Sequence, residues 1–227
     1  MIPLKDENPG TTIPVVTIGL IAANVIVYLY TLSLPERALE RFIMGYGLVP
    51  AELLGNAPHI HTAIPGALTL ATSMFMHGGL LHLLGNMLYL WIFGNNIEDL
   101  LGRFRFLIFY LACGVFAALA HVILNPNSTL PMVGASGAIA GVLGAYLITF
   151  PRARVLVLVF IVFFITTTRI PAFWVLGFWF VMQLMYVSSD VGSGANIAYM
   201  AHIGGFLVGM LLIRKMSPYR GWRAGWR

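Results

Sequence analysis

Seven apolar runs separated by short polar segments make up most of the chain, at about residues 13–30, 76–93, 104–124, 132–150, 155–165, 170–187 and 199–213. Helix-breaking prolines lie near many of their boundaries. A membrane-spanning helix needs roughly 20 apolar residues, whereas Val155–Ile165 would cover only about half of a hydrocarbon core at 1.5 Å per residue. We therefore interpret Val155–Ile165 as an interfacial or re-entrant piece. The pattern predicts an all-α, polytopic membrane protein with six transmembrane helices.

The composition supports a membrane protein. Of the 227 residues, 59% are hydrophobic and only 9% are charged, and the mean hydropathy is +0.87. A soluble domain carries about 25% charged residues. The length leaves room for a single domain over residues 1–227. The one cysteine, Cys113, excludes an intrachain disulfide, and the absence of CxxC or His/Cys clusters predicts no metal and no cofactor.

The basic residues report topology rather than nucleic-acid binding, because they lie in the segments between the apolar runs. With the N-terminus inside, six spans leave only Arg37 and Arg41 on the outer side and the other eleven basic residues on the inner side. This is the asymmetry of the positive-inside rule. We expect a short inner tail (residues 1–12), a basic inner tail (residues 214–227) and no cleaved signal peptide.

The longest connection, about Thr31 to Phe75, falls on the outer side between the first and second spans. Connections of this length are uncommon unless they fold on themselves or serve a site. We expect this segment to lie partly in the outer leaflet.

Polar side chains within the apolar runs are the candidates for chemistry, because each is costly in a membrane unless it is paired or wet. Three places stand out: Ser136 in "GASG", His202 in "AHIGG", and the pair His82 and Asn86 in "HGGLLHLLGN". The second, fourth and sixth spans all enter from the outer side, which puts these residues within roughly 5–15 Å of the outer helix ends. A seventh span would instead move His202 to the opposite leaflet.

Together these side chains have the composition of an acyl-transfer site, which needs a nucleophile, a base and fixed donors for the oxyanion. We expect His202 to take the proton from Ser136. His82 and Asn86 are four residues apart on one helix face and, with the backbone N–H of Ser136, would hold the oxyanion. The only nearby carboxylate, Asp190, is in a loop, so the prediction is a Ser–His dyad rather than a triad.

Glycines around the serine fit this hypothesis. Gly134 allows a tight turn before Ser136 and close approach of a substrate backbone. Small residues also line the fourth span and form a GxxxG in the sixth: Gly137, Ala140, Gly141, Gly144, Gly205 and Gly209. Small residues let two membrane helices approach closely. We expect this contact to bring Ser136 within reach of His202.

Taken one at a time, these residues also have structural interpretations. Ser136 could bond a backbone carbonyl, and His202 could bridge two helices. His82 and Asn86 could line a permeation path, as in a small transporter, although no inverted repeat is visible. A zinc protease is disfavoured because HExxH is absent and His77 is five residues from His82.

Other polar residues are assigned structural roles. We interpret His77 as fixing the loop before the second span and His121 as a satisfied interface histidine. Glu98 and Asp99 are expected to form an inner-side ion pair with Arg103 or a helix cap. His59 and His61 have no argued role.

The motifs "GASG", "AHIGG" and "HGGLLHLLGNMLYLWIFG" resemble the three signature regions of rhomboid intramembrane serine proteases. The resemblance covers nearly the whole chain from the first to the last span, including "YGLVPAELL" in the long connection. It implies a six-helix core with Ser136 as nucleophile and His202 as general base. Position by position, His82 and Asn86 match the oxyanion-side residues, and Glu98 matches the inner-side acid after the second span.

Two features depart from the family pattern. The Trp-Arg pair often found in the outer loop is missing, and Ala140 replaces the aromatic residue that some members carry one turn after the serine. Tyr146 and Tyr199 are therefore the candidates for stacking on the His202 ring.

The resemblance implies a serine endopeptidase that cleaves single-span or other membrane proteins near the outer face. Its partners would be these substrates and the lipid bilayer, without nucleic acid. We expect a multi-pass protein of a bacterial or archaeal cell membrane with both termini cytoplasmic. The alternative is a catalytically silent rhomboid-like protein that binds membrane clients.

Overall fold

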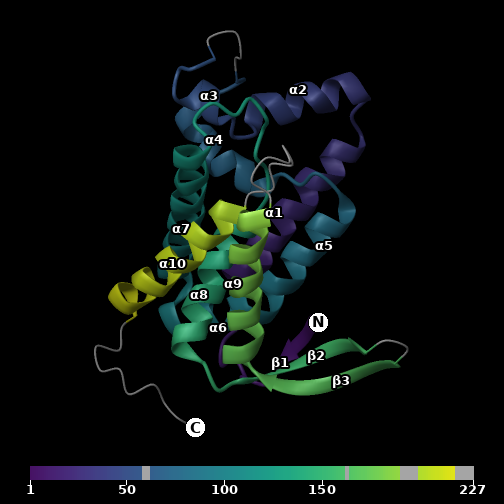
Figure 1. Cartoon of the computed structure of the whole chain (residues 1–227), viewed down its shortest axis with the longest axis vertical. Helices are drawn as coiled ribbons and strands as arrows, with labels where there is room; N and C mark the ends of the chain where they lie inside the picture. The colour runs from purple at the N-terminus through teal and green to yellow at the C-terminus, as the bar shows by residue number, and fades with distance from the viewer. Residues whose placement is uncertain (58–61, 162–163, 190–198, 218–227) are drawn as a thin grey trace.

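The protein is a helical bundle with a small sheet across one end, as seen in a computed structural model that describes residues 1–57, 62–161, 164–189 and 199–217 (Figure 1). Within these ranges, six of the seven apolar runs are helical. They form α1 (Val15–Leu32), α5 (Leu80–Tyr89), α7 (Arg103–Leu124), α8 (Ser136–Thr149), α9 (Ala172–Ser189) and α10 (Tyr199–Met216). A π-helical turn (Leu90–Gly94) continues α5 into α6 (Asn95–Leu101).

Several of these helices suit a membrane by length and composition. Among the described residues, α1 and α7 are each long and apolar enough to cross one, and a bent pair adds a third candidate. That pair joins Gly66–Phe75 to Leu80–Leu101 at an angle of 83°. Ser136–Thr149 and Ala172–Val187 are shorter apolar helices. The protein is therefore a mostly helical membrane protein.

The prediction of an all-α protein is wrong at one end of the molecule. The described residues of the run 155–165 do not form a helix but belong to two antiparallel strands, β2 (Arg154–Ile161) and β3 (Phe164–Pro171). The first residues of the chain, expected to be a tail, form β1 (Ile2–Asp6) and pair with β2. The sheet order is β1-β2-β3.

The local sequence explains the strand conformation of the hairpin. Valines alternate along β2, and Val155 and Val157 are fully buried against the bundle. β-branched side chains fit a half-buried pleated surface. The next strand carries three successive threonines, at positions 166–168. A strand must also satisfy its backbone groups, and here β1 and β3 do so from both sides.

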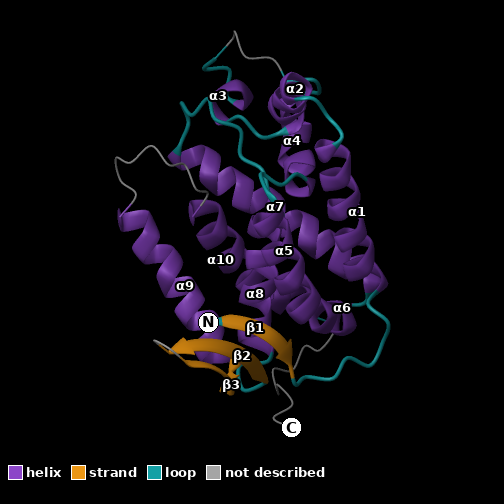
Figure 2. Cartoon of the chain, turned by 90° about the vertical axis from the view of Figure 1, so that its right-hand side faces the viewer, coloured by secondary structure: helices purple, strands orange, loops and turns teal. Residues whose placement is uncertain are grey.

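The chain between α1 and α5, predicted as a long connection, is largely helical at the opposite end of the bundle (Figures 1 and 2). Its helices are α2 (Glu36–Tyr46), α3 (Pro50–Leu53), α4 (Gly66–Thr72) and a 3-10 turn (Ser73–Phe75). A backbone bridge between Leu48 and Met132 ties this segment to the residues just before α8.

The central helix is α8, which packs against α7, α9 and α10. Every residue from Gly137 to Tyr146 is buried. Added Cβ atoms on Gly205 and Gly209 of α10 would overlap the carbonyl groups of Gly137 and Gly141 of α8. The expected close contact between these two small-residue faces is therefore confirmed.

The carboxylates after the second apolar run bind the start of α1. Glu98 accepts hydrogen bonds from the backbone N–H groups of Val16 (2.9 Å) and Thr17 (2.7 Å). Asp99 accepts hydrogen bonds from the hydroxyls of Thr11 and Thr12. The first N–H groups of a helix have no intrahelical partner and carry partial positive charge. Of the two predicted roles, the structure shows the helix cap.

Candidate active site

Ser136 is the first residue of α8, at the end of that helix away from the sheet. The turn before it depends on Gly134, whose φ of +133° is rarely adopted by residues with a side chain. The backbone N–H of Gly134 donates to the carbonyl of Ser73 (2.9 Å). The turn at Gly134 thus fixes where α8 begins and holds the Ser136 hydroxyl at the helix start.

The Ser136 hydroxyl is hydrogen-bonded to His202. Its Oγ lies 2.8 Å from Nε2 of His202, which is in the first turn of α10. The glycine contact between α8 and α10 allows this distance, because larger residues would hold the helices apart. A hydroxyl in contact with a ring nitrogen is the arrangement in which histidine can accept the serine proton.

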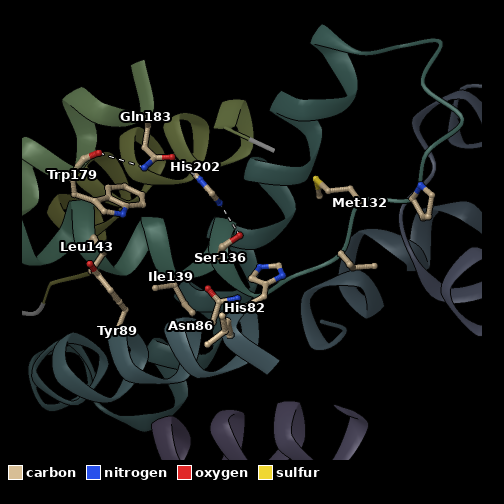
Figure 3. Close-up of a pocket in the computed structure, with 14 residues that line it drawn as sticks. His82, Asn86, Tyr89, Met132, Ser136, Ile139, Leu143, Trp179, Gln183 and His202 are labelled. Carbon is tan, nitrogen blue, oxygen red and sulfur yellow. Dashed lines mark hydrogen bonds between the residues drawn. The ribbon is translucent and has the colours of Figure 1, made fainter. Parts of the chain in front are cut away.

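The second ring nitrogen of His202 is also bonded. Its Nδ1 lies 2.9 Å from Oε1 of Gln183, a buried residue of α9. The side-chain amide of Gln183 donates in turn to the backbone carbonyl of Trp179 (3.4 Å). Figure 3 shows the resulting chain of contacts from Trp179 through Gln183 and His202 to Ser136.

Sequence reasoning missed Gln183. The dyad predicted from the sequence has no partner on the far side of the imidazole, because that place is usually taken by a carboxylate and the nearest one is Asp190. Asp190 lies outside the described residues, as do His59 and His61. The available signal was an amide side chain in the otherwise apolar fifth span.

Aromatic rings surround His202. Trp179 of α9 lies 5.9 Å from it between ring centroids at an interplanar angle of 42°. Tyr199 lies 6.4 Å away, edge-on at 79°. The other stacking candidate, Tyr146, packs against Phe93 and donates its hydroxyl to Asp6. The suggestion of Tyr146 is therefore wrong, and Trp179 is the ring that sequence reasoning overlooked.

His82 and Asn86 approach the serine from α5. An added Cβ on Gly134 would lie 3.0 Å from Nε2 of His82 and 3.6 Å from Oγ of Ser136, so the His82 ring lies beside the serine turn. Asn86 Nδ2 lies 2.8 Å from Nε2 of His77, and the rings of His77 and His82 meet edge-on at 5.0 Å. His77 therefore holds the Asn86 amide.

The candidate catalytic residues face one cavity of about 590 Å³. Polar groups lie together along its wall: His82, Asn86, Ser136, Gln183 and His202. The rest is mostly apolar, and its lining includes Tyr89, Met132, Ile139, Leu143 and Trp179. Figure 3 shows these side chains converging from α5, α8, α9 and α10, with Met132 on the segment before α8. A few convergent polar groups in an apolar cavity are typical of a binding or catalytic site.

Comparison with known proteins now decides the family. A family model described as the rhomboid domain matches residues 65–219. The chain belongs to the rhomboid family. Members of this family are generally intramembrane serine proteases, and some members are inactive.

Several curated proteins resemble this rhomboid. Rhomboid protease GluP of Bacillus subtilis is 44% identical over 78 residues, covering 34% of this chain and 15% of that protein. Presenilin-associated rhomboid-like protein A of Danio rerio, a mitochondrial protein, is 30% identical over 211 residues, covering 88% of this chain and 49% of that protein. Mitochondrial Rhomboid protein 1 of Saccharomyces cerevisiae is 30% identical over 159 residues, covering 65% and 41%. The chain spans less than half the length of each of these three relatives.

Two further histidines of the rhomboid have structural surroundings. His77 is buried, and beyond its bond to Asn86 its Nδ1 has no hydrogen-bond partner among the described residues. His121 is buried near the end of α7, where its Nδ1 lies 3.5 Å from Nδ2 of Asn125. Across the described part of the chain, no group of three or more His, Cys, Asp or Glu side chains is placed to hold a metal ion.

Proposed function

We propose that this rhomboid is an intramembrane serine endopeptidase, with Ser136 as nucleophile and His202 as general base. The observation that supports it most strongly is the 2.8 Å contact between Ser136 Oγ and His202 Nε2. Both side chains line a cavity large enough to admit a peptide segment. A serine that only served packing would not need a histidine on its hydroxyl and an open cavity beside it.

The reaction follows from this geometry. As Ser136 Oγ bonds to the scissile carbonyl carbon, its proton moves to Nε2 of His202. The carbonyl oxygen becomes an oxyanion, for which His82, Asn86 and the backbone N–H of Ser136 are the donors. Nε2 then gives its proton to the leaving nitrogen as the C–N bond breaks. Water then attacks the acyl carbon while Nε2 of His202 takes a proton from it, and Nε2 returns this proton to Oγ of Ser136 as the bond between Oγ and the acyl carbon breaks.

Asn86 can serve the oxyanion while it is held by His77. A side-chain amide nitrogen carries two hydrogens. One is directed to Nε2 of His77, and the other remains for a substrate oxygen. Gly134 contributes by leaving room for His82 beside the serine turn. These assignments make Gly134, His82 and Asn86 the oxyanion and substrate-binding side of the site.

The proposal includes six spans formed by α1, α5–α6, α7, α8, α9 and α10, with both termini on the inner side. With 14 residues, α8 is about 21 Å long, whereas a hydrocarbon core is about 30 Å thick. A helix this short can begin below the outer surface, so Ser136 would sit at membrane depth. The substrates would be single-span or other membrane proteins that reach the cavity from the bilayer.

The expected location in a bacterial or archaeal membrane stays a prediction, because the relatives include a bacterial protein and mitochondrial ones.

The orientation of the protein in the membrane can be tested with cysteines introduced at Lys5 and Arg37, since the natural Cys113 is buried. A membrane-impermeant thiol reagent added outside should label Arg37→Cys and not Lys5→Cys. The reverse pattern would contradict the topology.

Cleavage of a model transmembrane substrate in proteoliposomes tests the activity. Wild type should cleave it and react with a fluorophosphonate probe, and Ser136→Ala should do neither. Ser33→Ala replaces an exposed serine far along the chain from the site and should behave as wild type. Wild-type protein that is folded but neither cleaves nor labels would favour the catalytically silent, client-binding alternative. Cleavage by Ser136→Ala would reject the assigned nucleophile.

A further inference from the structure

Gln183 occupies the place that an acidic residue takes in a serine triad. Its Oε1 lies 2.9 Å from Nδ1 of His202, on the side of the ring opposite Ser136. An amide oxygen can only accept a hydrogen bond, so Nδ1 must carry the hydrogen. Nε2 is then left with its lone pair facing the serine hydroxyl, which is the form of the ring that can accept the proton.

The orientation of the Gln183 amide is itself fixed. Its nitrogen donates to the backbone carbonyl of Trp179, four residues earlier on the same helix. This turns the amide nitrogen away from His202 and the oxygen toward it. Gln183 is only 7% exposed, so its amide is held between α9 and His202.

Packing holds the same geometry from a second direction. Trp179 lies against both His202 and Phe206, with ring centroids 5.9 Å and 6.0 Å apart. Trp179 and Gln183 lie one turn apart on α9, so one face of that helix presents a ring and an amide to His202. Two residues of α9 therefore hold the imidazole: Gln183 bonds its Nδ1 and Trp179 packs against its ring.

We propose that Gln183 is a positioning residue that completes a Ser136–His202–Gln183 triad, with a neutral amide in place of the usual carboxylate. This inference rests on the proposed peptidase function and names a residue that the expected dyad lacks. An amide in this place has a precedent in Cys-His-Asn proteases. Gln183 does not take a proton. It sets the tautomer and the angle of the ring that does.

The test compares Gln183→Met with Gln183→Glu in full-length protein in proteoliposomes. Methionine keeps the length of the side chain and removes the acceptor, so kcat should fall on the order of 10–100-fold with little change in KM. That loss is smaller than the roughly 10⁴-fold loss seen when the aspartate of a charged triad is replaced. Glutamate keeps an acceptor at the same place and should restore most of kcat.

A spectroscopic measurement separates orientation from general damage. The ¹⁵N signals of the His202 ring, assigned by their loss in His202→Ala, should show a hydrogen on Nδ1 in wild type and Gln183→Glu. In Gln183→Met, a share of the signal should move to the form with the hydrogen on Nε2. Val175→Ala replaces another buried α9 residue, about two turns from Gln183, and should change neither kcat nor the tautomer.

Failure of the positioning role of Gln183 can be distinguished from failure of the proposed peptidase function. Wild-type kcat in Gln183→Met, or equal loss in Gln183→Met and Gln183→Glu, overturns the positioning role while Ser136→Ala remains inactive. An unchanged His202 tautomer in Gln183→Met also overturns it. If instead Ser136→Ala retains activity, the proposed function fails, and the tautomer measurement still reports whether Gln183 orients His202.

Discussion

The carboxylate of Asp6 accepts a 2.7 Å hydrogen bond from the hydroxyl of Tyr146, a residue 140 positions away along the chain. The same oxygen accepts a second bond, of 2.8 Å, from the amide of Asn96. Asp6 ends β1, and Tyr146 belongs to α8, the helix that begins with Ser136. The N-terminal strand is thereby attached to the helix that carries the candidate nucleophile.

Burial of Asp6 predicts a pH-dependent stability. Burial raises the pKa of Asp6 above its ordinary value of 3.8, although the bonds from Tyr146 and Asn96 act in the opposite direction. Between the ordinary and the raised pKa, the folded protein binds more protons than the unfolded chain. The contribution of Asp6 to stability is therefore present at low pH and is lost as the pH rises through the raised pKa.

Thermal unfolding in detergent from pH 4 to 7 measures this effect. The midpoint of wild type relative to Asp6→Asn should fall as the pH rises. Tyr146→Phe removes a bond that favours the charged carboxylate, so it should raise the pKa of Asp6 further and extend the loss of stability to higher pH. It should also cost about 1 kcal/mol of stability. Parallel curves for wild type and Asp6→Asn would contradict the assignment.

Gly134→Ala should impair both the turn and the site. The substitution forces a residue with a side chain to adopt a φ of +133° and places a Cβ 2.9 Å from Cε1 of His82. Backbone strain of this kind costs about 1–3 kcal/mol. We expect a lower unfolding midpoint and slower fluorophosphonate labelling of Ser136. Gly19→Ala, on an exposed and open face of α1, should leave both unchanged.

Gly209→Ala should separate α8 from α10. The added methyl group would overlap the backbone of Gly141, and overpacking of this kind costs about 1–3 kcal/mol. Because this contact brings Ser136 to His202, peptidase activity should fall more than stability alone explains. Gly177→Ala, which places a methyl group in open space on α9, is the matched control. Normal kcat in folded Gly209→Ala would show that the contact does not set the distance.

Asn86→Ala should lose more kcat than His77→Ala. Removing one oxyanion donor costs about 10²–10³ in rate, so Asn86→Ala should lose that much kcat while remaining folded. His77→Ala leaves the Asn86 amide in place but free to rotate, and we expect a loss of about tenfold by the same reasoning. His77→Gln keeps a hydrogen-bonding group and should recover part of the loss. A larger loss in His77→Ala than in Asn86→Ala would show that His77 acts other than through Asn86.

The site was more predictable from the sequence than the sheet was. Ser136, His202, His82 and Asn86 lie in short motifs whose spacing and place in apolar runs indicate chemistry without knowledge of the fold. The roles given to them remain proposals. Gln183 and Trp179 escaped notice because their importance arises only where α9 meets α10, and an isolated amide or indole in an apolar run has no distinctive spacing.

The sequence by itself determined the membrane class, the helices of the apolar runs and the small-residue faces of α8 and α10, because these depend on local periodicity and composition. It did not determine that Ile2–Asp6 pairs with Arg154–Ile161, since strand pairing depends on partners that are distant in the chain. Only the tertiary structure decided that Asp6 reaches Tyr146 and that Gln183 reaches His202. Such hydrogen bonds exist only when the packing of separate helices and strands brings donor and acceptor atoms to within about 3 Å of each other.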